Sequence, residues 1–291
     1  MKTRHCGACE ISSVEETTIP FRKPIDMYPD VTEEMVDRHR PWMVPDYMDA
    51  DTDMLLFAFQ SFVIRTPRLT ILVDTCIGNE KERPGRPLWH RQKFPWMSNL
   101  AATGLTPADI DIVMCTHLHI DHVGWNTQLK DGRWVPTFPN ARYVFSEKEY
   151  RHWESMLGSS EVGDNVFNDS VLPVVEEGRA DLVRDDHEID HGIVLEPTPG
   201  HTPGHVALHL DSEGDTALFT GDLFHHPLQV VEPDLSSSVC TDADLSRKSR
   251  YDFLGKYADT GALVIPAHFT GTGVGEVRSE GDGWRFDFAR E

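Results

Sequence analysis

The sequence predicts an α/β fold of the α+β kind, in which two mixed β-sheets pack together with helices on the outside. Three observations support this fold class over the 291 residues. Strand-like apolar segments predominate, helical segments are interspersed among them, and residues capable of chemistry recur where strands end. No linker divides the chain, so we expect a single domain, residues 1–291, with an irregular N-terminal segment 1–53 and an insert at 79–98.

Alternation of apolar residues and turn signals locate the elements of the first half. Predicted strands lie at residues 54–66, 68–78, 109–117 and 141–146. Short helices are predicted at residues 32–40, 98–105 and, with a proline in its first turn, 106–110. A longer helix over 146–156 begins with a capping box, in which Glu149 follows Ser146 by three residues.

The second half continues the alternation of strands and helices. Predicted strands lie at residues 193–201, 205–211, 215–222 and 262–269. The spacing of apolar residues predicts an amphipathic helix over 245–258. The final segment, 275–288, predicts a hairpin.

The chain carries 27 Lys and Arg against 48 Asp and Glu, a formal net charge of −21. Such a surface repels nucleic acid and anionic membranes unless a local basic patch intervenes, and the sequence has no long basic run. No stretch approaches 18 apolar residues, so we expect no transmembrane helix. Because the N-terminus also lacks the apolar core of a signal peptide, we expect a cytoplasmic protein. The sequence leaves the oligomeric state open, with a homodimer as a candidate.

The five cysteines do not predict a disulfide framework. Cys6 and Cys9 form a CxxC beside His5, and one CxxC without a second ligand pair is weak evidence for zinc. We therefore favour an N-terminal turn there, with a metal or redox role as the alternative. The other three read as small core or loop residues: Cys76, Cys115 and Cys240.

The segment 115–125 places four potential metal ligands within six positions, namely His117, His119, Asp121 and His122. A polar turn would explain this segment alone, but three later strands end in the same kinds of residue, namely His201, Asp222 and His268. Loops at strand ends are where a rigid scaffold presents functional groups. Seven imidazole and carboxylate ligands suit two divalent ions, of which Zn²⁺ is favoured and Mn, Fe and Co are alternatives.

These motifs resemble those of the metallo-β-lactamase superfamily. The matching stretches are THLHIDH, TPGHTPGH, FTGD and PAH, in that order, preceded by the early strand ILVDTCIG. The resemblance covers roughly residues 55–275. It implies an αββα sandwich, the metallo-β-lactamase fold, with the site at one edge of the two sheets.

The resemblance also implies a role for each ligand. The first ion would be held by His117, His119 and His201, and the second by Asp121, His122 and His268, with Asp222 bridging the two. Asp74 stands at the position of the family's supporting acid, where it would orient ligands or backbone near the site. The alternative for Asp74 is an ordinary carboxylate in a strand-end turn.

The expected chemistry is hydrolysis. Two cations that share one water lower its pKa towards neutrality and supply hydroxide, which would attack a lactone or ester carbonyl. Asp121 could accept the proton of the nucleophile. Lactonases of the family place a Tyr three residues after the bridging Asp, and here that residue is His225, which could donate a proton or hydrogen-bond the substrate oxygen. A loop histidine is the alternative, with His226 as the fallback.

The insert at 79–98 is too rich in aromatic residues for an ordinary solvated loop. Pockets are commonly lined by aromatic side chains with few polar groups. The candidates for lining a pocket are Trp89, Phe94 and Trp96 in the insert, Trp125 after the metal motif, and His226. Each of the four aromatic residues could equally belong to the core. An apolar pocket would favour hydrophobic lactones, aryl esters or neutral organophosphates.

Differences between this sequence and several branches of the superfamily reduce the number of candidate functions. Zinc β-lactamases lack a bridging Asp such as Asp222, and flavodiiron proteins have Glu where this chain has His119. Only 23 residues follow His268, too few for the C-terminal domain of a glyoxalase II, and the acidic charge argues against an RNA-binding arm.

Lactonases, pyridoxolactonase-like enzymes and methyl-parathion-hydrolase-like enzymes remain, the last being most similar. The leading hypothesis is a metal-dependent lactonase or esterase. The alternatives are an organophosphate triesterase or hydrolytic dehalogenase on the same site and, least favoured, a non-hydrolytic redox or metal-binding module.

Overall fold

The computed structural model describes residues 3–157 and 165–290, which form two compact units. Unit 1 comprises residues 18–58 and 188–290, and unit 2 comprises residues 3–17, 59–157 and 165–187. The chain passes between the units within two long strands and again near residue 187. Each unit contributes one large sheet, so that neither unit is a continuous stretch of sequence.

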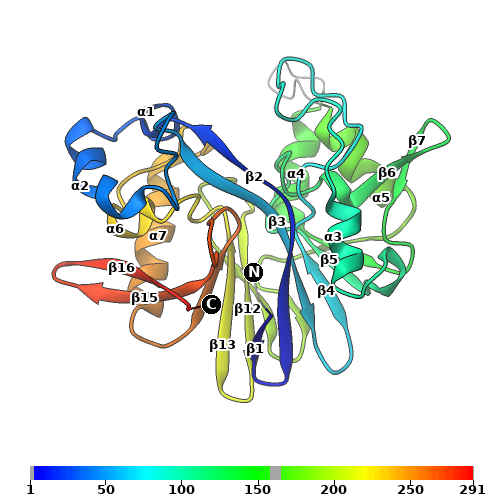
Figure 1. The fold of residues 1–291 in the computed structure, drawn as a ribbon. Helices are drawn as coiled ribbons and strands as arrows, with labels where there is room; N and C mark the ends of the chain where they lie inside the picture. Colours follow the sequence, from blue (N-terminus) through cyan, green and yellow to red (C-terminus); the bar gives the residue numbers. More distant parts are fainter. Residues whose placement is uncertain (1–2, 158–164, 291) are drawn as a thin grey trace. The chain divides into compact units, whose positions relative to one another are not determined.

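Unit 2 is built on a seven-stranded mixed sheet (Figure 1). Its order is β1 (Arg4–Cys6), β2 (Cys9–Arg22), β3 (Leu55–Arg65), β4 (Thr70–Val73), β5 (Ile112–Met114), β8 (Arg142–Ser146) and β9 (Ala180–Val183). From β4 to β9 the neighbouring strands run parallel. Because parallel strands end at the same edge of a sheet, the residues that follow β4 and β5 are brought together there.

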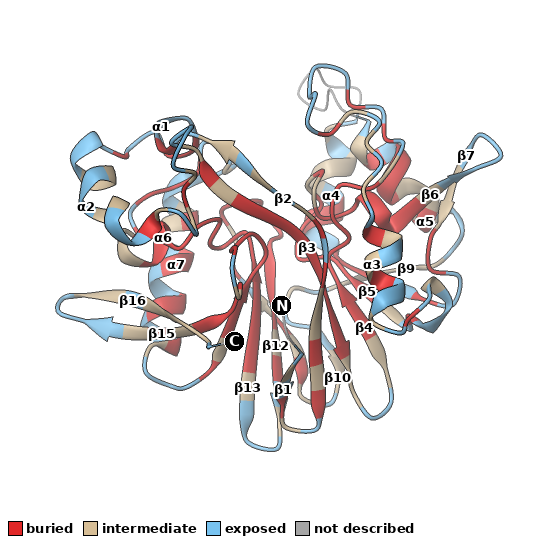
Figure 2. Cartoon of the chain, in the orientation of Figure 1, coloured by how far each residue is buried: buried red, intermediate tan, exposed pale blue. Residues whose placement is uncertain are grey.

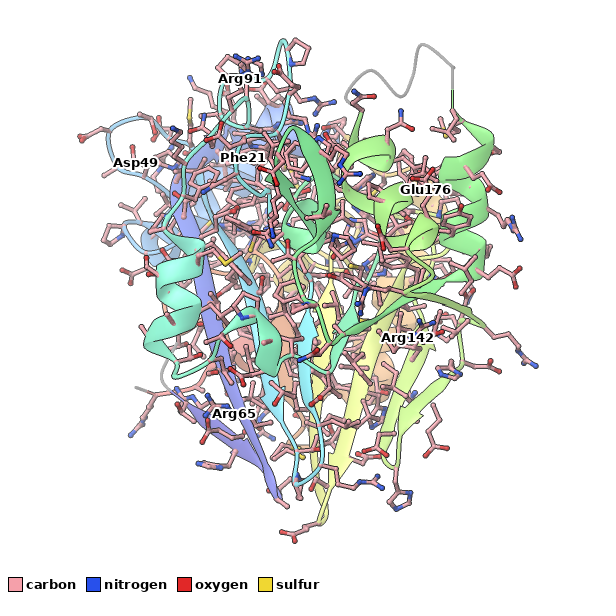
Figure 3. The ribbon with its side chains drawn as sticks, turned by 90° about the vertical axis from the view of Figure 1, so that its right-hand side faces the viewer. Phe21, Asp49, Arg65, Arg91, Arg142 and Glu176 are labelled. Carbon is pink, nitrogen blue, oxygen red and sulfur yellow. The ribbon has the colours of Figure 1, made fainter. Side chains whose placement is uncertain are left out.

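Helices and a small hairpin complete unit 2. The helices are α3 (Trp96–Ala102), α4 (Glu147–Ser155) and α5 (Leu172–Glu176), with the short turns η1 (Pro107–Asp109), η2 (Gly124–Asn126) and η3 (Phe167–Val171). The hairpin pairs β6 (Thr127–Lys130) with β7 (Arg133–Pro136). Ion pairs between neighbouring strands, of Arg65 with Glu10 and of Arg142 with Asp181, lie at the margins of the sheet (Figure 3).

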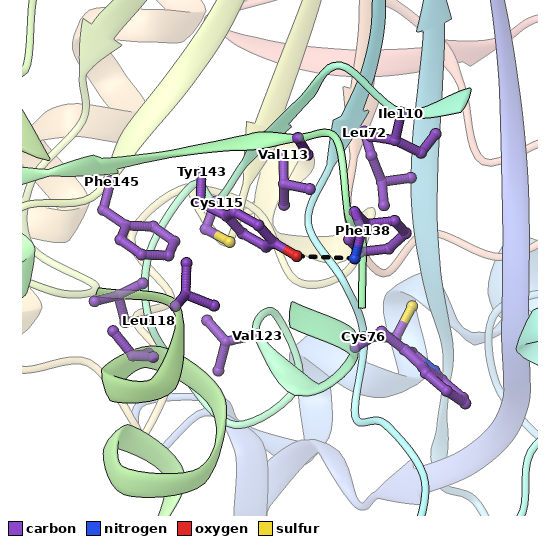
Figure 4. Close-up of a cluster of buried hydrophobic side chains, with 14 of the residues drawn as sticks. Leu72, Cys76, Ile110, Val113, Cys115, Leu118, Val123, Phe138, Tyr143 and Phe145 are labelled. Atoms are coloured by element: carbon purple, nitrogen blue, oxygen red, sulfur yellow. Dashed lines mark hydrogen bonds between the residues drawn. The ribbon is translucent and has the colours of Figure 1, made fainter. Parts of the chain in front are cut away.

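Figure 4 shows the apolar core of unit 2. Side chains of β4, β5 and β8 meet those of the helices, and the backbone N–H of Phe138 donates to the buried Tyr143 hydroxyl at 3.1 Å. Burial raises the pKa of Tyr143, so the hydroxyl stays protonated and donates in turn to the carbonyl of Asn126. The core therefore packs tightly beneath the loop that follows β5.

Unit 1 is built on a second seven-stranded mixed sheet. Its order is β10 (Glu188–Asp190), β11 (Ile193–Pro197), β12 (Val206–Ser212), β13 (Asp215–Gly221), β14 (Leu263–Pro266), β15 (Gly275–Glu280) and β16 (Gly283–Phe288). Among the described strands of this sheet, β13 and β14 alone pair in parallel. Figure 2 shows buried residues along β12 and β13 and exposed residues at the turn that joins them, as expected for a sheet whose far end is solvated.

The helices of unit 1 are α1 (Pro24–Met27), α2 (Glu33–Met43), α6 (Leu228–Val231) and α7 (Ala243–Tyr257). One apolar cluster joins Phe253 and Leu254 of α7 to Leu218 of β13 and Val264 of β14. Helix α7 therefore covers part of the second sheet. Among the residues that the structure describes, no helix has the length and apolar character needed to cross a membrane.

Two mixed sheets with accompanying helices confirm the predicted fold class. The predicted helix at 32–40 is confirmed by α2, and the final hairpin by β15 and β16. The expectation of an irregular segment over 1–53 is wrong, because residues 4–22 form the antiparallel hairpin of β1 and β2. Cys6 and Cys9 are register partners on either side of its turn, which confirms the turn expected there.

The predicted capping box of α4 is half formed. The Ser146 hydroxyl accepts from the backbone N–H of Glu149 at 3.2 Å, as predicted. The Glu149 carboxylate does not reach back to the cap but accepts instead from the backbone N–H of Leu118 at 3.1 Å. The carboxylate that would complete the capping box therefore binds the loop after β5.

A contact between α7 and the sheet of unit 1 gives a prediction about pH. The Tyr257 hydroxyl donates to Glu196 and lies 3.2 Å from Nδ1 of His209. The Glu196 carboxylate, 3.7 Å from Nδ1 of His209, raises the pKa of the imidazole above 6.5. The protonated ring therefore stabilises the fold below about pH 6.5, and this contribution is lost as pH rises through the raised pKa.

We expect the His209→Gln variant to be less stable than the natural chain by about 0.5–1 kcal/mol at about pH 5.5, the range for a partly exposed pair. The difference should shrink at about pH 9. Urea unfolding at both pH values measures it. His191→Gln, at a side chain 98% exposed, is the matched control and should show no such trend. A difference that grows with pH would contradict the prediction.

Candidate metal centre

The loop that follows β5 presents four potential ligands of unit 2, namely His117, His119, Asp121 and His122. Nε2 of His117 lies 3.0 Å from Nδ1 of His119, and Nε2 of His122 lies 4.0 Å from Oδ1 of Asp121. His117 and His122 are buried, whereas His119 and Asp121 are partly exposed. The structure therefore brings the predicted ligands of this unit into one short loop.

Asp74, directly after β4, organises this loop. Its carboxylate accepts from the backbone N–H of Thr116 at 2.8 Å, from the Thr116 hydroxyl at 2.9 Å and from Nδ1 of His122 at 2.8 Å. A histidine that donates through Nδ1 keeps an electron pair on Nε2, the form in which imidazole binds a metal. The contacts of Asp74 thus orient both the backbone and one candidate ligand.

We expect Asp74→Asn to weaken metal binding by about 10–100-fold, the usual cost of losing a partner that orients a ligand. The amide would present a donor to Nδ1 of His122 and turn the imidazole to the wrong tautomer. Titration with Zn²⁺ in competition with a chelator measures the loss. The matched control is Asp111→Asn near the opposite end of β5, where the carboxylate also caps a backbone N–H, that of Thr70. An unchanged affinity for Asp74→Asn would refute its orienting role.

Two further acids that the sequence did not reveal hold the same loop. Glu149 of α4 accepts from the backbone of Leu118, within the metal motif. Glu16 of β2 is buried and accepts from the backbone N–H groups of Ile77 and Gly78 and from the indole of Trp125. Desolvation raises the pKa of Glu16 to about 7, although the hydrogen bonds from these donors lower it. The sequence marked Glu149 only as part of a capping box and did not mark Glu16, because both of these contacts join distant segments.

Glycine is required where this loop meets the one after β4. A Cβ on Gly124 would lie 1.9 Å from the carbonyl oxygen of Ile77, closer than any real contact. The backbone of Gly124 donates to the carbonyl of Cys76 at 2.8 Å instead. The close approach of these two loops is therefore specified by a residue without a side chain.

Unit 1 presents its potential ligands at the ends of three strands. His201 follows β11, Asp222 follows β13 and His268 follows β14. Nε2 of His201 lies 3.2 Å from Oδ2 of Asp222, and Nε2 of His268 lies 3.0 Å from Oδ1 of the same carboxylate. All three side chains are buried. The structure thus gathers the three predicted ligands of this unit around Asp222.

The donors around Asp222 fit a divalent metal ion. Nδ1 of His268 donates to the carbonyl of Ala58 at 2.9 Å, so that Nε2 faces the carboxylate with its electron pair. Two electron-pair donors repel each other unless a cation or proton lies between them. Two ligands of one tetrahedral Zn²⁺, each at about 2.0–2.1 Å, lie about 3.3 Å apart, close to the separations seen here.

His201 is held in the form that binds a metal. Burial lowers the pKa of His201 to about 3, so the ring is neutral across the physiological range. Nδ1 of His201 lies 3.6 Å from the thiol of Cys240, whose pKa is raised by burial. Nε2 is thereby left to face Asp222.

The second histidine of TPGHTPGH, which we did not single out from the sequence, positions Asp222. Nε2 of His205 accepts from the backbone N–H of Asp222 at 3.0 Å, while Nδ1 contacts the Thr198 hydroxyl at 2.8 Å. Gly200 lies in the same turn, and a Cβ there would meet the backbone nitrogen of Ser246 at 2.0 Å. The TPGHTPGH motif therefore supplies one predicted ligand, His201, and holds a second one, Asp222, by a hydrogen bond to its backbone N–H.

The family model of the metallo-beta-lactamase superfamily matches residues 60–268. This chain belongs to the metallo-β-lactamase superfamily. The match includes every predicted metal ligand and confirms the resemblance drawn from the motifs. The matched residues run from within β3 to the loop after β14.

Curated relatives of this superfamily member include lactonases. An N-acyl homoserine lactonase from a Bacillus species is 27% identical over 164 residues, which cover 52% of this chain and 58% of the lactonase. The metallo-beta-lactamase domain-containing protein 1 of Xenopus laevis is 27% identical over 201 residues, 69% of this chain and 66% of that protein. The match thus spans little more than half the length of the lactonase.

Solved structures of the superfamily extend the similarity of fold to the whole chain. A hydrolase named AbOPH, of the beta lactamase superfamily, aligns with a TM-score of 0.80 at 22% identity over 99% of this chain and 98% of its own. The dizinc quorum-quenching lactonase AidC aligns with a TM-score of 0.80 at 19% identity over 100% and 97%. At these identities the similarity establishes the fold.

Two of the aromatic residues predicted to line a pocket belong instead to the core of this superfamily member. Trp96 is fully buried, stacks on Trp125 with ring centroids 5.3 Å apart and donates to the Ser61 hydroxyl at 3.1 Å. Trp125 donates to the buried Glu16. Trp89, packed edge-on against Phe59, and the half-buried Phe94 remain candidates for a pocket.

His226, the fallback for His225, has a structural role. Nε2 of His226 donates to the carbonyl of Tyr47 at 2.8 Å, and Nδ1 accepts from the backbone N–H of Leu228 at 3.1 Å. Burial lowers the pKa of His226 to about 4, which keeps the ring neutral and both contacts intact. Both nitrogens of His226 are therefore engaged with the backbone.

Proposed function

We propose that this protein is a dinuclear metal-dependent hydrolase that opens lactones or cleaves esters. The observation that supports it best is the pair of strand-end ligand sets, one in each unit, in which an acceptor at Nδ1 of His122 and of His268 places the electron pair of each ring on Nε2. Membership of the metallo-β-lactamase superfamily supports the union of the two sets in one centre. His117, His119 and His201 would hold one ion, Asp121, His122 and His268 the other, and Asp222 would bridge them.

Divalent ions bound by these residues would lower the pKa of a water towards neutrality and polarise the carbonyl oxygen of the substrate. The side chains of the protein supply the rest. Asp121, the more exposed carboxylate of the set, would accept the proton of the nucleophile. Asp74 accepts from Nδ1 of His122, and the carbonyl of Ala58 accepts from Nδ1 of His268, so that each ring carries its electron pair on Nε2, the nitrogen that would bind a metal. With Asp74 and the carbonyl of Ala58 orienting ligands in this way, Asp121 is the carboxylate placed to exchange protons with solvent.

The lactone substrate is supported by the relatives. The curated relatives with 26–29% identity include several N-acyl homoserine lactonases, and a dizinc lactonase shares the fold along nearly the whole chain. Zinc is the metal we propose for the same reason. Trp89 and Phe94 of the insert would contribute the apolar surface that an acyl chain needs.

A substrate panel tests the proposal. Purified, zinc-loaded protein is assayed on acyl homoserine lactones of several chain lengths, on aryl esters and on neutral phosphotriesters, with kcat/KM as the measure. We expect lactones to be the best substrates and a chelator to abolish every activity. Phosphotriesters as the best substrates would establish the alternative, an organophosphate hydrolase on the same site.

The same panel can overturn the proposal. Full-length protein with two bound metals and no hydrolysis of any substrate class would refute the hydrolase assignment. Bound iron together with oxygen consumption would indicate a redox module instead. Activity that survives complete removal of the metal would refute the dinuclear mechanism.

A further inference from the structure

The CxxC near the N-terminus closes the hairpin of unit 2, apart from the predicted metal ligands. Cys6 ends β1, Cys9 begins β2, and the two cysteines are register partners in this antiparallel pair (Figure 1). Gly7 and Ala8 form the turn between them, and Gly7 has a φ of 52°, the left-handed backbone that tight hairpin turns favour. The spacing of the motif is therefore that of a two-residue turn.

The register places both thiols on one face of the hairpin. Directly opposed residues of an antiparallel pair point to the same side, and the side alternates from one residue to the next. Cys6 and Cys9 are 1% and 5% exposed, so their face packs against the protein. The next register pair, His5 and Glu10, points to the other face, where Glu10 binds Arg65 at 3.1 Å. The two thiols therefore lie beside each other.

The pair is close enough for a disulfide. Opposed residues of an antiparallel pair have Cα atoms about 4.5–5.5 Å apart, and a disulfide joins Cα atoms about 4.4–6.8 Å apart. Their Cβ atoms, about 4.5–5.5 Å apart in a sheet, need to approach by about 1 Å to reach the usual disulfide spacing. Both cysteines are free thiols in this structure. A small adjustment of the turn is thus enough to join them.

A metal site is the competing use for such a pair, and the hairpin does not favour it. A structural zinc ion needs four ligands, of which one CxxC supplies two. His5, the ligand-type residue beside the motif, points to the opposite face. Among the described residues, no group of ligand-type side chains close enough to share an ion includes Cys6 or Cys9. Redox chemistry needs the two thiols alone.

The thiols become accessible when β1 opens. This strand has three residues and lies at the edge of its sheet, with β2 as its neighbour. A short edge strand opens locally at a lower free-energy cost than strands inside the sheet. Cys6 lies on the strand that opens, and Cys9 stays three positions away across the turn. The first thiol to meet a solute therefore has a second thiol within reach.

We infer that Cys6 and Cys9 form a reversible dithiol–disulfide site that reacts with small disulfides of the glutathione type. The Cys6 thiolate attacks the S–S bond of the small disulfide, forms a mixed disulfide and releases one small thiol. The Cys9 thiolate then attacks the Cys6 sulfur, closes the cross-link and releases the second small thiol. The two electrons lost by the cysteines reduce the small disulfide, and the two cysteine protons end on the released thiols.

The test is oxidation of the folded, full-length chain by excess oxidised glutathione at about pH 8, near the ordinary thiol pKa of about 8.5. Remaining thiols are then alkylated, and tryptic cleavage after Arg4 and Arg22 yields one peptide, residues 5–22, that carries both cysteines. We expect this peptide to be unalkylated and lighter than its reduced form by two hydrogen atoms. A phosphine reductant should return both thiols.

Matched variants distinguish this cross-link from general thiol oxidation. Cys6→Ser and Cys9→Ser should each lose the cross-link, and glutathione should remain attached to Cys6 in Cys9→Ser. The double variant Cys9→Ser, Glu10→Cys moves the second thiol to the opposite face and should also lose the cross-link. Cys240→Ser removes the least buried of the five cysteines and should cross-link like the natural chain.

Three outcomes would overturn the inference. The first is a peptide 5–22 that keeps two free thiols or carries two glutathiones, because the thiols then fail to react or to reach each other. The second is a cross-link formed equally well in the Glu10→Cys double variant, which would show that the register does not bring the thiols together. The third is protection of both thiols by Zn²⁺, which would establish a metal site. Hydrolysis is not a readout, so this inference and the proposed function fail independently.

Discussion

Replacing Asp222 with Ala is expected to lower hydrolysis by about 10³-fold or more and to reduce the bound metal from two ions to one or none. The carboxylate contacts three imidazole nitrogens at 3.0–3.2 Å and is the one anion among the described ligands of unit 1. A factor of 10³ corresponds to about 4 kcal/mol, within the several kcal/mol that metal ions contribute to such reactions. Elemental analysis and kcat/KM on the preferred substrate measure the two effects.

The matched control is Asp215→Asn, at the exposed turn before the same strand, which should retain both metal and activity. Circular dichroism distinguishes loss of metal from loss of fold. Full activity with one ion or none, in either the natural chain or Asp222→Ala, would refute a dinuclear centre. Loss of activity with both ions retained would show that Asp222 takes part in the reaction and is not needed to bind the metals.

Replacing Trp96 with Ala is expected to destabilise the protein by about 3–5 kcal/mol, the usual cost of removing a buried Trp or Phe side chain. The indole is fully buried, stacks on Trp125, meets Phe138 edge-on at 6.1 Å and satisfies the Ser61 hydroxyl. Because natural proteins are stable by only about 5–15 kcal/mol, the variant should unfold at clearly lower denaturant concentration.

Trp42→Ala is the matched control, because that indole is 37% exposed and its loss should cost far less. Variants of Trp96 that fold at low temperature should keep the KM of the natural protein. Unchanged stability of Trp96→Ala together with a raised KM would show that Trp96 lines a substrate pocket.

Most of the fold was predictable, because its strands carry local signals. Segments such as 54–66 and 215–222 are apolar, rich in β-branched or aromatic residues and bounded by turn residues, and strands formed there. The hairpin at 4–22 was missed because its alternation is built from Glu, Ser and Thr, whose preference for strands depends on what lies beside them. The strand structure of residues 4–22 therefore depends on pairing with neighbouring strands.

The metal ligands were predictable for a different reason: each follows a strand and belongs to a compact motif. Of the residues that orient them, Asp74 was predicted from the family resemblance, but Glu16 was not. Glu16 accepts from the backbone N–H groups of Ile77 and Gly78 and from the indole of Trp125, which are 61 to 109 positions away, and no spacing rule marks these contacts. Trp96 and Trp125 show the same limit. The sequence left them open between pocket and core, because the burial of an aromatic side chain depends on neighbours that only the fold brings together.

The discontinuous division of the chain has a consequence for its synthesis on the ribosome. All segments of unit 2 precede residue 188, whereas residues 18–58 of unit 1 must await residues 188–290. At about 5–20 residues per second, the last segment of unit 1 needs about 5–20 s to be made. During that interval residues such as Phe57 and Met48, buried in the finished protein, have no sheet to cover them. The nascent chain therefore presents a short-lived apolar segment near its beginning, which is where we expect a holding chaperone to bind while the C-terminal half is translated.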